Sequence, residues 1–136
     1  MAEKRAGRQT VVFADPPVIA AAASVVGPKE GEGPLADYMD MVLEDDLFGE
    51  KSFEKAETQI FLQAARLALS KADITPRDVD YLLGGDLLNQ IITANFAARD
   101  LGIPFFGLYG ACSTITESLS LAAMLIDGGY DERILC

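Results

Sequence analysis

The second half of the chain alternates short apolar runs with amphipathic stretches. The runs at 79–83, 104–109 and 133–136 have the length and residue types of buried strands. Between them, residues 87–101 and 113–127 repeat apolar positions at helical spacing, and glycine follows each stretch. Strands that alternate with helices in this way predict right-handed crossovers and a parallel sheet with helices on its faces.

The first half is less regular. Residues 10–14 and 18–26 are apolar runs bounded by Pro-Pro and Gly-Pro, and we interpret both as strands. A glycine-rich loop at 27–34 leads to residues 35–46, where apolar positions recur at helical spacing among many acidic residues. We predict a short acidic helix over 35–46.

The clearest helix is predicted after Ser52, a suitable N-cap, and should run to about Lys71. Residues 75–78 combine a threonine cap, a proline at the first helical position and an acid three residues after the cap. This combination predicts a single helical turn before the strand at 79–83. The chain then stops inside its last apolar run, 133–136. Because buried parallel strands are normally continued and covered, we expect a chain truncated at its C-terminus.

Composition narrows the function classes. Half of the 136 residues are hydrophobic and 24% are charged, which is typical of a globular domain. The net charge is −10, with no basic cluster beyond Lys4, Arg5 and Arg8, so nucleic acid and anionic membranes are poor partners. The sequence contains no histidine, which excludes a self-contained Cys-His pair, Ser-His-Asp triad or His-ligated zinc site. Two cysteines are too few for a disulfide framework, and Asp15-Pro16-Pro17 interrupts the only signal-like segment, so we do not expect secretion.

Two loops of the predicted sheet carry candidate chemistry, because ligands bind parallel sheets outside the carboxyl ends of the strands. Residues 84–90 follow one strand and residues 110–114 follow the next, so both loops should open at one edge. Cys112 then lies in the first turn of a helix, whose free amides and dipole favour a thiolate or a bound anion. The spacing is as compatible with Cys112 as a small buried residue, beside Ser113 and Thr114 as helix caps.

Polar residues of the first loop are further candidates. Asp86 either caps the helix that follows or contacts a ligand. Asn89 and Gln90 offer donors and acceptors that suit a carboxylate or a carbonyl, although solvated amides would look the same. Lys29, in a glycine-rich loop without the spacing of a phosphate-binding loop, is one of few cations available to an acidic ligand.

Four segments resemble a known family: GPKEGEGPL at 27–35, GGDLLNQIITAN at 84–95, IPFFGLYGACSTITES at 103–118 and LIDGG at 125–129. They are similar to the stage V sporulation protein AD family of endospore-forming bacteria, a branch of the thiolase-like superfamily. The similarity begins near Gln9. GDLLNQ followed at matching distance by GACST is specific to this family, whereas a cysteine after a strand is common to all thiolase-like proteins.

The resemblance implies an α/β fold of the thiolase-like αβαβα type, built from two similar halves with a mixed, mainly parallel sheet. Residues 1–136 would form most of the N-terminal half, and the full-length protein would be a homodimer. In thiolases and ketoacyl synthases, the cysteine matching Cys112 accepts the acyl group, and His or Asn residues of the second half complete the site. Those partners are absent from this sequence.

The resemblance also implies a function. The family is associated with binding dipicolinic acid (pyridine-2,6-dicarboxylate) and moving it into the developing spore, together with other proteins of the same sporulation operon. We expect a location on the cytoplasmic side of the forespore or spore inner membrane, peripherally associated, with no cofactor and no metal. An acyltransferase with Cys112 as nucleophile and a scaffold without either activity are the alternatives. The expected ligand contacts are Asp86, Asn89, Gln90, Cys112, Ser113 and Thr114, with Lys29 or Arg99 as the cation.

Overall fold

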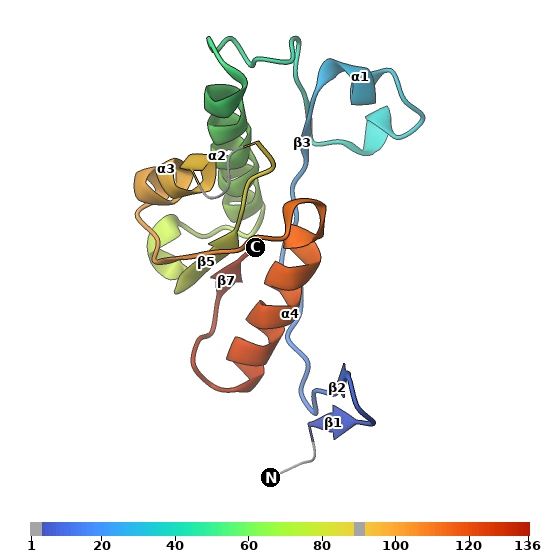
Figure 1. Cartoon of the computed structure of the whole chain (residues 1–136), viewed down its shortest axis with the longest axis vertical. Coiled ribbons are helices and arrows are strands. Elements are labelled where there is room, and N and C mark those ends of the chain that lie inside the picture. Colours follow the sequence, from blue (N-terminus) through green and yellow to red (C-terminus); the bar gives the residue numbers. More distant parts are fainter. Residues whose placement is uncertain (1–3, 89–91) are drawn as a thin grey trace.

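A three-stranded parallel sheet organises the protein, which we describe from a computed structural model covering residues 4–88 and 92–136. Strand β5 (Tyr81–Gly84) lies between β6 (Phe105–Gly107) and β7 (Ile134–Leu135). Both pairs are parallel, which confirms the strands predicted around 79–83, 104–109 and 133–136 and their direction. The helices between these strands lie against the sheet (Figure 1).

Helices α2 (Phe53–Lys71) and α3 (Ile92–Leu101) pack against each other and against one face of the sheet. The α2 helix begins where predicted, because the Ser52 side chain accepts a hydrogen bond from Lys55 N at 3.4 Å. The described part of α3 starts later than the predicted residue 87. A buried cluster joins these helices to β5 and consists of Leu62, Ala65, Leu69, Val79, Leu82, Ala97, Ala98, Leu101 and Ile103.

Helix α4 (Thr114–Asp127) covers the opposite face of β5, in agreement with the predicted helix at 113–127. Leu82 and Leu83 are each 1% exposed and, as successive strand residues, point to opposite faces. The buried Ser118 of α4 lies beside Leu83, with its hydroxyl 3.4 Å from the Leu83 carbonyl oxygen. Part of α4 faces outward with large apolar side chains that are 41–53% exposed: Ile115, Leu119, Leu121 and Met124.

The strands predicted at 10–14 and 18–26 are largely wrong. Strand β2 (Thr10–Val11) only forms an antiparallel hairpin with β1 (Arg5–Ala6), and β3 covers only Val25–Val26. Val18 and Ile19 are 87% and 72% exposed. Without burial, their β-forming side chains gain nothing from a strand conformation at that place. The hairpin is attached to α4 by an ion pair between Lys4 Nζ and Asp127 Oδ2, at 2.6 Å.

The acidic helix predicted over 35–46 is also wrong. This region contains a short 3-10 turn, η1 (Ala36–Tyr38), and strand β4 (Met41–Val42), which pairs in parallel with β3. One helical turn, α1 (Pro28–Gly31), precedes it in the glycine-rich loop. Backbone pairing outcompetes the helical pattern: the amides of Met41 and Leu43 donate to Ser24 O and Val26 O.

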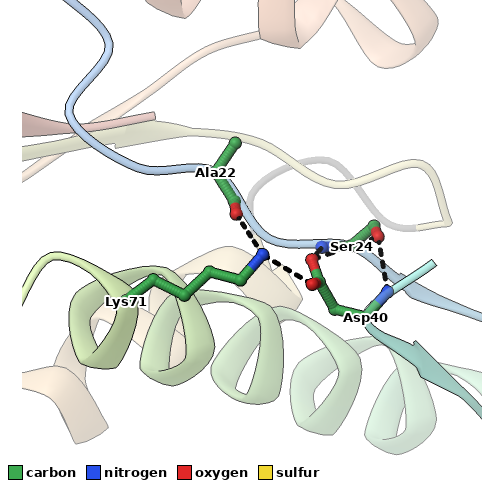
Figure 2. A network of polar contacts seen from close by, with 4 residues as sticks. All are labelled: Ala22, Ser24, Asp40 and Lys71. Atoms are coloured by element: carbon green, nitrogen blue, oxygen red, sulfur yellow. Dashed lines mark hydrogen bonds and ion pairs between the residues drawn. The ribbon is translucent and has the colours of Figure 1, made fainter. Parts of the chain in front are cut away.

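A polar network fixes this parallel pair to the end of α2 (Figure 2). Lys71 Nζ donates to Ala22 O at 2.9 Å and to the Asp40 carboxylate. Asp40 also accepts from Ser24 N at 2.9 Å, and its own amide donates to Ser24 Oγ at 3.0 Å. The Lys71 hydrogen bond and the Ser24 amide hold the pKa of Asp40 below its usual value.

Two further contacts align the ends of β5. The predicted turn is confirmed as η2 (Pro76–Asp78), where Thr75 N and Oγ1 donate to the Asp78 carboxylate at 2.8 and 2.7 Å. Asp80 accepts from Glu132 N and Arg133 N at 3.0 and 2.9 Å, which brings β7 beside β5. These bonds lower the pKa of Asp80.

The pKa of the neighbouring Asp131 carboxyl is shifted in the opposite direction. Its Oδ2 atom is buried and has no hydrogen-bond partner among the described residues. Loss of hydration and the charge of Asp80 raise the pKa of Asp131.

Candidate functional site

The loops after β5 and β6 meet at the carboxyl edge of the sheet, as predicted from the order of strands. Leu108 N donates to Gly84 O at 2.8 Å. A Cβ atom on Gly85 would overlap Leu108 O and lie 3.4 Å from Thr114 Cγ2, at the start of α4. The close approach of the two loops therefore depends on the missing side chain at Gly85.

Cys112 is exposed and lies in a 3-10 turn, η3 (Ala111–Ser113), directly before α4. The sequence predicts Cys112 in the first turn of a helix, whereas the structure places it in a turn ahead of the α-helix. Ala111 has a φ of 45°, a left-handed conformation that costs a non-glycine residue about 1–3 kcal/mol. The strained residue thus presents the thiol to solvent at the N-terminal end of α4. The interpretation of Cys112 as a small buried residue is wrong.

Cys136, which follows β7, differs from Cys112 in its surroundings. Cys136 is partly buried, and the loss of hydration raises the pKa of its thiol to about 11. Because thiolate reactivity requires the deprotonated form, Cys136 is poorly suited to nucleophilic chemistry. Cys112 is the candidate nucleophile of the pair.

Ser113 and Thr114 lie beside Cys112, but their side chains do not cap the helix as the alternative interpretation expected. Ser113 Oγ lies 2.6 Å from Glu117 Oε1 and 2.9 Å from Gly110 O, and makes no side-chain cap. Thr114 Oγ1 is buried and has no hydrogen-bond partner within the part of the chain that the structure describes. A buried hydroxyl without a partner is costly, so Thr114 Oγ1 is an unsatisfied polar atom at this corner.

Glu117 is the main charge at this corner. A Cβ atom on Gly110 would lie 2.5 Å from Glu117 Oε1, so the carboxylate folds over the turn that carries Cys112. Its negative charge is favourable at the N-terminal end of α4 because of the helix dipole. The same charge opposes a second anion at that place. An anionic ligand must therefore bind beside Glu117 or displace it.

Asp86 lies in the other loop and holds the start of α3. The side chain is 9% exposed, and its Oδ2 accepts from Thr93 N at 2.7 Å, Ala94 N at 3.3 Å and Thr93 Oγ1 at 2.6 Å. It therefore caps a helix, as one interpretation predicted, although it reaches amides seven and eight residues later. These bonds all involve Asp86 Oδ2.

Glu57, which shares the Thr93 hydroxyl with Asp86, could not be singled out from the sequence. Its Oε1 accepts from Leu87 N at 2.8 Å, and its Oε2 lies 2.9 Å from Thr93 Oγ1. Glu57 lies on α2, thirty residues before Leu87, and nothing in its spacing distinguishes it from other helical acids. Only the packing of α2 against α3 reveals its role.

Among the described residues, the expected cations make no hydrogen bond or ion pair with these loops. Lys29 belongs to α1, which Figure 1 shows apart from the start of α4. Arg99 donates from Nε and a terminal nitrogen to Asp100 Oδ1 at 2.9 and 2.8 Å, and its guanidinium lies 5.1 Å from the centre of the Phe96 ring. The predicted contacts Asn89 and Gln90 lie outside the described residues.

Two surface depressions lie outside the two loops. Among the described residues, one depression lies at the end of α2, around Arg66, Ser70 and Asp73, and another lies on the outer side of α4, around Glu117 and Leu121. Within the same residues, no group of three or more acidic or cysteine side chains is placed to hold a metal ion. No helix in this part of the chain is both long and apolar enough to cross a bilayer.

Comparisons with known proteins agree on the family and the fold. The family model for stage V sporulation protein AD matches residues 7–136. The stage V sporulation protein AD of Bacillus subtilis strain 168 is 45% identical over 132 residues, which are 97% of this chain and 39% of that protein. The chain therefore spans about two fifths of the length of this curated relative.

More distant similarity extends to enzymes. The beta-ketoacyl-[acyl-carrier-protein] synthase III of Helicobacter pylori strain G27 is 31% identical over 91 residues, or 62% of this chain and 28% of that protein. The crystal structure of 3-oxoacyl-[acyl-carrier-protein] synthase III from Aquifex aeolicus superposes with a TM-score of 0.52 at 25% identity. It matches 62% of this chain and 28% of that one. These matches confirm the predicted thiolase-like α/β fold, of which the described residues show a part.

Proposed function

Because the chain belongs to the stage V sporulation protein AD family, we propose that it serves sporulation by binding dipicolinic acid for uptake into the developing spore. The observation that carries this proposal is the 45% identity over 97% of the chain. The proposed role is binding rather than catalysis. Its ligand site lies where the loops after β5 and β6 meet.

The chemistry of this corner supports a planar dianion as the ligand. The amides at the start of α4 and the unpartnered Thr114 hydroxyl are donors that a carboxylate group can use. Ser113 and Cys112 border the same turn. Asp86 contributes indirectly, by holding the start of α3.

The negative charge of the chain opposes the binding of a dianion. The net charge of −10 and the Glu117 carboxylate repel a dianion, and Lys29 and Arg99 do not lie beside the loops to compensate. At physiological ionic strength, charges beyond roughly 8 Å are screened, so affinity depends on groups in the immediate neighbourhood of the ligand. We propose that Asn89 and Gln90 supply further donors. We propose that the cation that pairs with the ligand comes from the portion of the relatives' length that this chain does not match.

The proposal is tested by titration calorimetry of the whole gene product with dipicolinate, with picolinate as a ligand that lacks one carboxylate. We expect dipicolinate to bind and picolinate to bind more weakly. Thr114→Val, which removes the hydroxyl at constant shape, should weaken dipicolinate binding about tenfold to a hundredfold, the effect of one hydrogen bond to a charged carboxylate. Ser120→Ala removes an exposed hydroxyl of α4 and serves as the matched control. Absence of dipicolinate binding contradicts the function, and unchanged affinity of Thr114→Val contradicts the site.

We further propose that the protein acts as a homodimer with other proteins of the same sporulation operon, peripherally bound at the cytoplasmic side of the forespore or spore inner membrane. Extraction of spore membranes with high salt or carbonate should release it, as expected for a peripheral protein. Release only by detergent would contradict this location.

An acyltransferase is the second candidate, favoured by the exposed Cys112 at its strained turn and by the synthase III similarity. In this reaction, the Cys112 thiolate would attack the thioester carbonyl of an acyl-CoA. A bond forms between Cys112 Sγ and the acyl carbon, and coenzyme A leaves as its thiol after taking up a proton. The sequence contains no histidine to serve as the base.

Mass spectrometry of the whole gene product after incubation with acetyl-CoA decides between the two candidates. An acetyl adduct on wild type that is lost in Cys112→Ala would establish the transfer. Unmodified protein would leave binding as the function. Cys136→Ala is the matched control, because its thiol is partly buried and has a raised pKa.

A further inference from the structure

Glu57 joins helix α2 to both ends of the segment that connects β5 with α3. Its Oε1 accepts from Leu87 N at 2.8 Å, directly after Asp86. Its Oε2 lies 2.9 Å from Thr93 Oγ1, in the first turn of α3. One carboxyl group therefore spans the entry and the exit of this segment from a rigid 19-residue helix.

The Thr93 hydroxyl connects Glu57 with Asp86. This hydroxyl has a single proton, and its oxygen lies 2.6 Å from Asp86 Oδ2 and 2.9 Å from Glu57 Oε2. Thr93 is 1% exposed, so water cannot relieve an unfavourable contact there. The Thr93 hydroxyl therefore donates its proton to one of these two carboxylates at a time. A side chain at position 57 that accepts from Leu87 N and donates to Thr93 Oγ1 would leave this proton for Asp86.

The segment lies against the other loop of the candidate site. Gly85, one residue before Asp86, leaves room for Leu108 O and approaches Thr114 at the start of α4. A shift of the Asp86–Leu87 backbone therefore changes the packing next to the Cys112 turn. Because packed elements transmit small displacements, the contact made by Glu57 affects the site without touching a ligand.

We propose that Glu57 is a positioning residue, which holds Leu87 and Thr93 in place beside Asp86 and so controls ligand affinity at the adjacent turn. The second part of this statement rests on the proposed function. The first part concerns hydrogen bonding alone. An amide side chain at position 57 reproduces both contacts, since its oxygen accepts from Leu87 N and its nitrogen donates to Thr93 Oγ1.

Hydrogen exchange of the Leu87 amide in the whole gene product tests the first part. Glu57→Ala should accelerate exchange at Leu87 by about tenfold to a hundredfold, as expected for the loss of a charge-assisted bond, and Glu57→Gln should keep it within about twofold of wild type. Glu44→Ala, which removes an exposed carboxylate before α2, is the control. Unchanged exchange in Glu57→Ala, or equally fast exchange in Glu57→Gln, would overturn the proposal.

A second variant keeps the test decisive. If Glu57→Ala does not fold, Thr93→Val removes the hydroxyl that links Glu57 to Asp86, and exchange at Leu87 should rise several-fold. Unchanged exchange in that variant also overturns the proposal.

Dipicolinate titration tests the second part. Binding should weaken in Glu57→Ala and be retained in Glu57→Gln. Wild-type affinity in Glu57→Ala would refute the control of affinity, whereas failure of wild type to bind would refute the proposed function and leave exchange to decide the positioning role.

Discussion

The contact between the two loops at Gly85 leads to a quantitative prediction for Gly85→Ala. A Cβ atom there would overlap the backbone oxygen of Leu108 and lie 3.3 Å from its carbonyl carbon. The obstacle is backbone of the neighbouring loop, which cannot rotate away as a long side chain would. The two loops must therefore separate by part of an ångström for the methyl group to fit.

The expected cost follows from two opposing effects. Overpacking a close contact costs about 1–3 kcal/mol. Replacing glycine by alanine also restricts the unfolded chain, which stabilises the folded state by about 0.4–1 kcal/mol. The free energy of unfolding should therefore fall by about 1–2 kcal/mol. Gly27→Ala is the matched control, because its φ is −73° and the nearest atom, Asp46 Oδ1, would lie 3.6 Å from the new methyl group.

Urea denaturation of the whole gene product, with wild type and both variants in parallel, measures this difference. We expect the midpoint to move to lower urea in Gly85→Ala, with an unchanged slope, and to stay near wild type or above it in Gly27→Ala. If Gly85→Ala is as stable as Gly27→Ala, the loops do not approach each other as described. Ligand affinity should fall in Gly85→Ala for the same geometric reason.

Other predictions concern charge and exposed apolar surface. Asp131→Asn should stabilise the protein at neutral pH, because it removes a charge that lacks a hydrogen-bond partner among the described residues and is repelled by Asp80. This gain in stability should vanish as pH falls through the raised pKa of Asp131, and denaturation at several pH values measures it. The depressed pKa of Asp40 predicts the opposite trend: its contact with Lys71 stabilises above about pH 4 and is lost below it, so acid should destabilise wild type more than Lys71→Met. A polypeptide of residues 1–136 should self-associate and bind a hydrophobic dye through the exposed side chains of α4, and a monodisperse monomer in light scattering would contradict this.

The sequence pattern predicted the part of the fold in which local preference and burial agree. The sequence of helix α2 has a capping serine and an apolar stripe, and the structure confirms both the cap and the burial of the stripe in the core. The parallel sheet followed from strands separated by helices, because only such crossovers connect parallel neighbours. The site loops were placed together for the same reason.

The predictions from sequence are wrong where tertiary contacts determine the local structure. Residues 35–46 have a helical stripe, but the amides of Met41 and Leu43 pair with β3 and the Asp40 carboxylate binds Lys71, so the stripe never packs as a helix. No local signal shows such a partner. Within the site, Cys112 could be predicted from its turn, whereas Glu57 could not, because its contact with Leu87 depends on how two helices pack. The sequence allows Asp86 to be either a cap or a ligand contact, and its hydrogen bond to Ala94 N depends on where α3 begins relative to β5.

The position of the buried cluster has a consequence for the order of folding. All nine of its residues lie between Leu62 and Ile103, so forming this core closes only short loops of chain. Pairing of β5 with β7, in contrast, joins Tyr81 to Ile134. Contacts between nearby residues form fastest, which makes the α2–β5–α3 unit the expected folding nucleus and β7 a late addition. During synthesis, the residues that hold Asp86 in place would thus be ordered before Cys112 reaches its position.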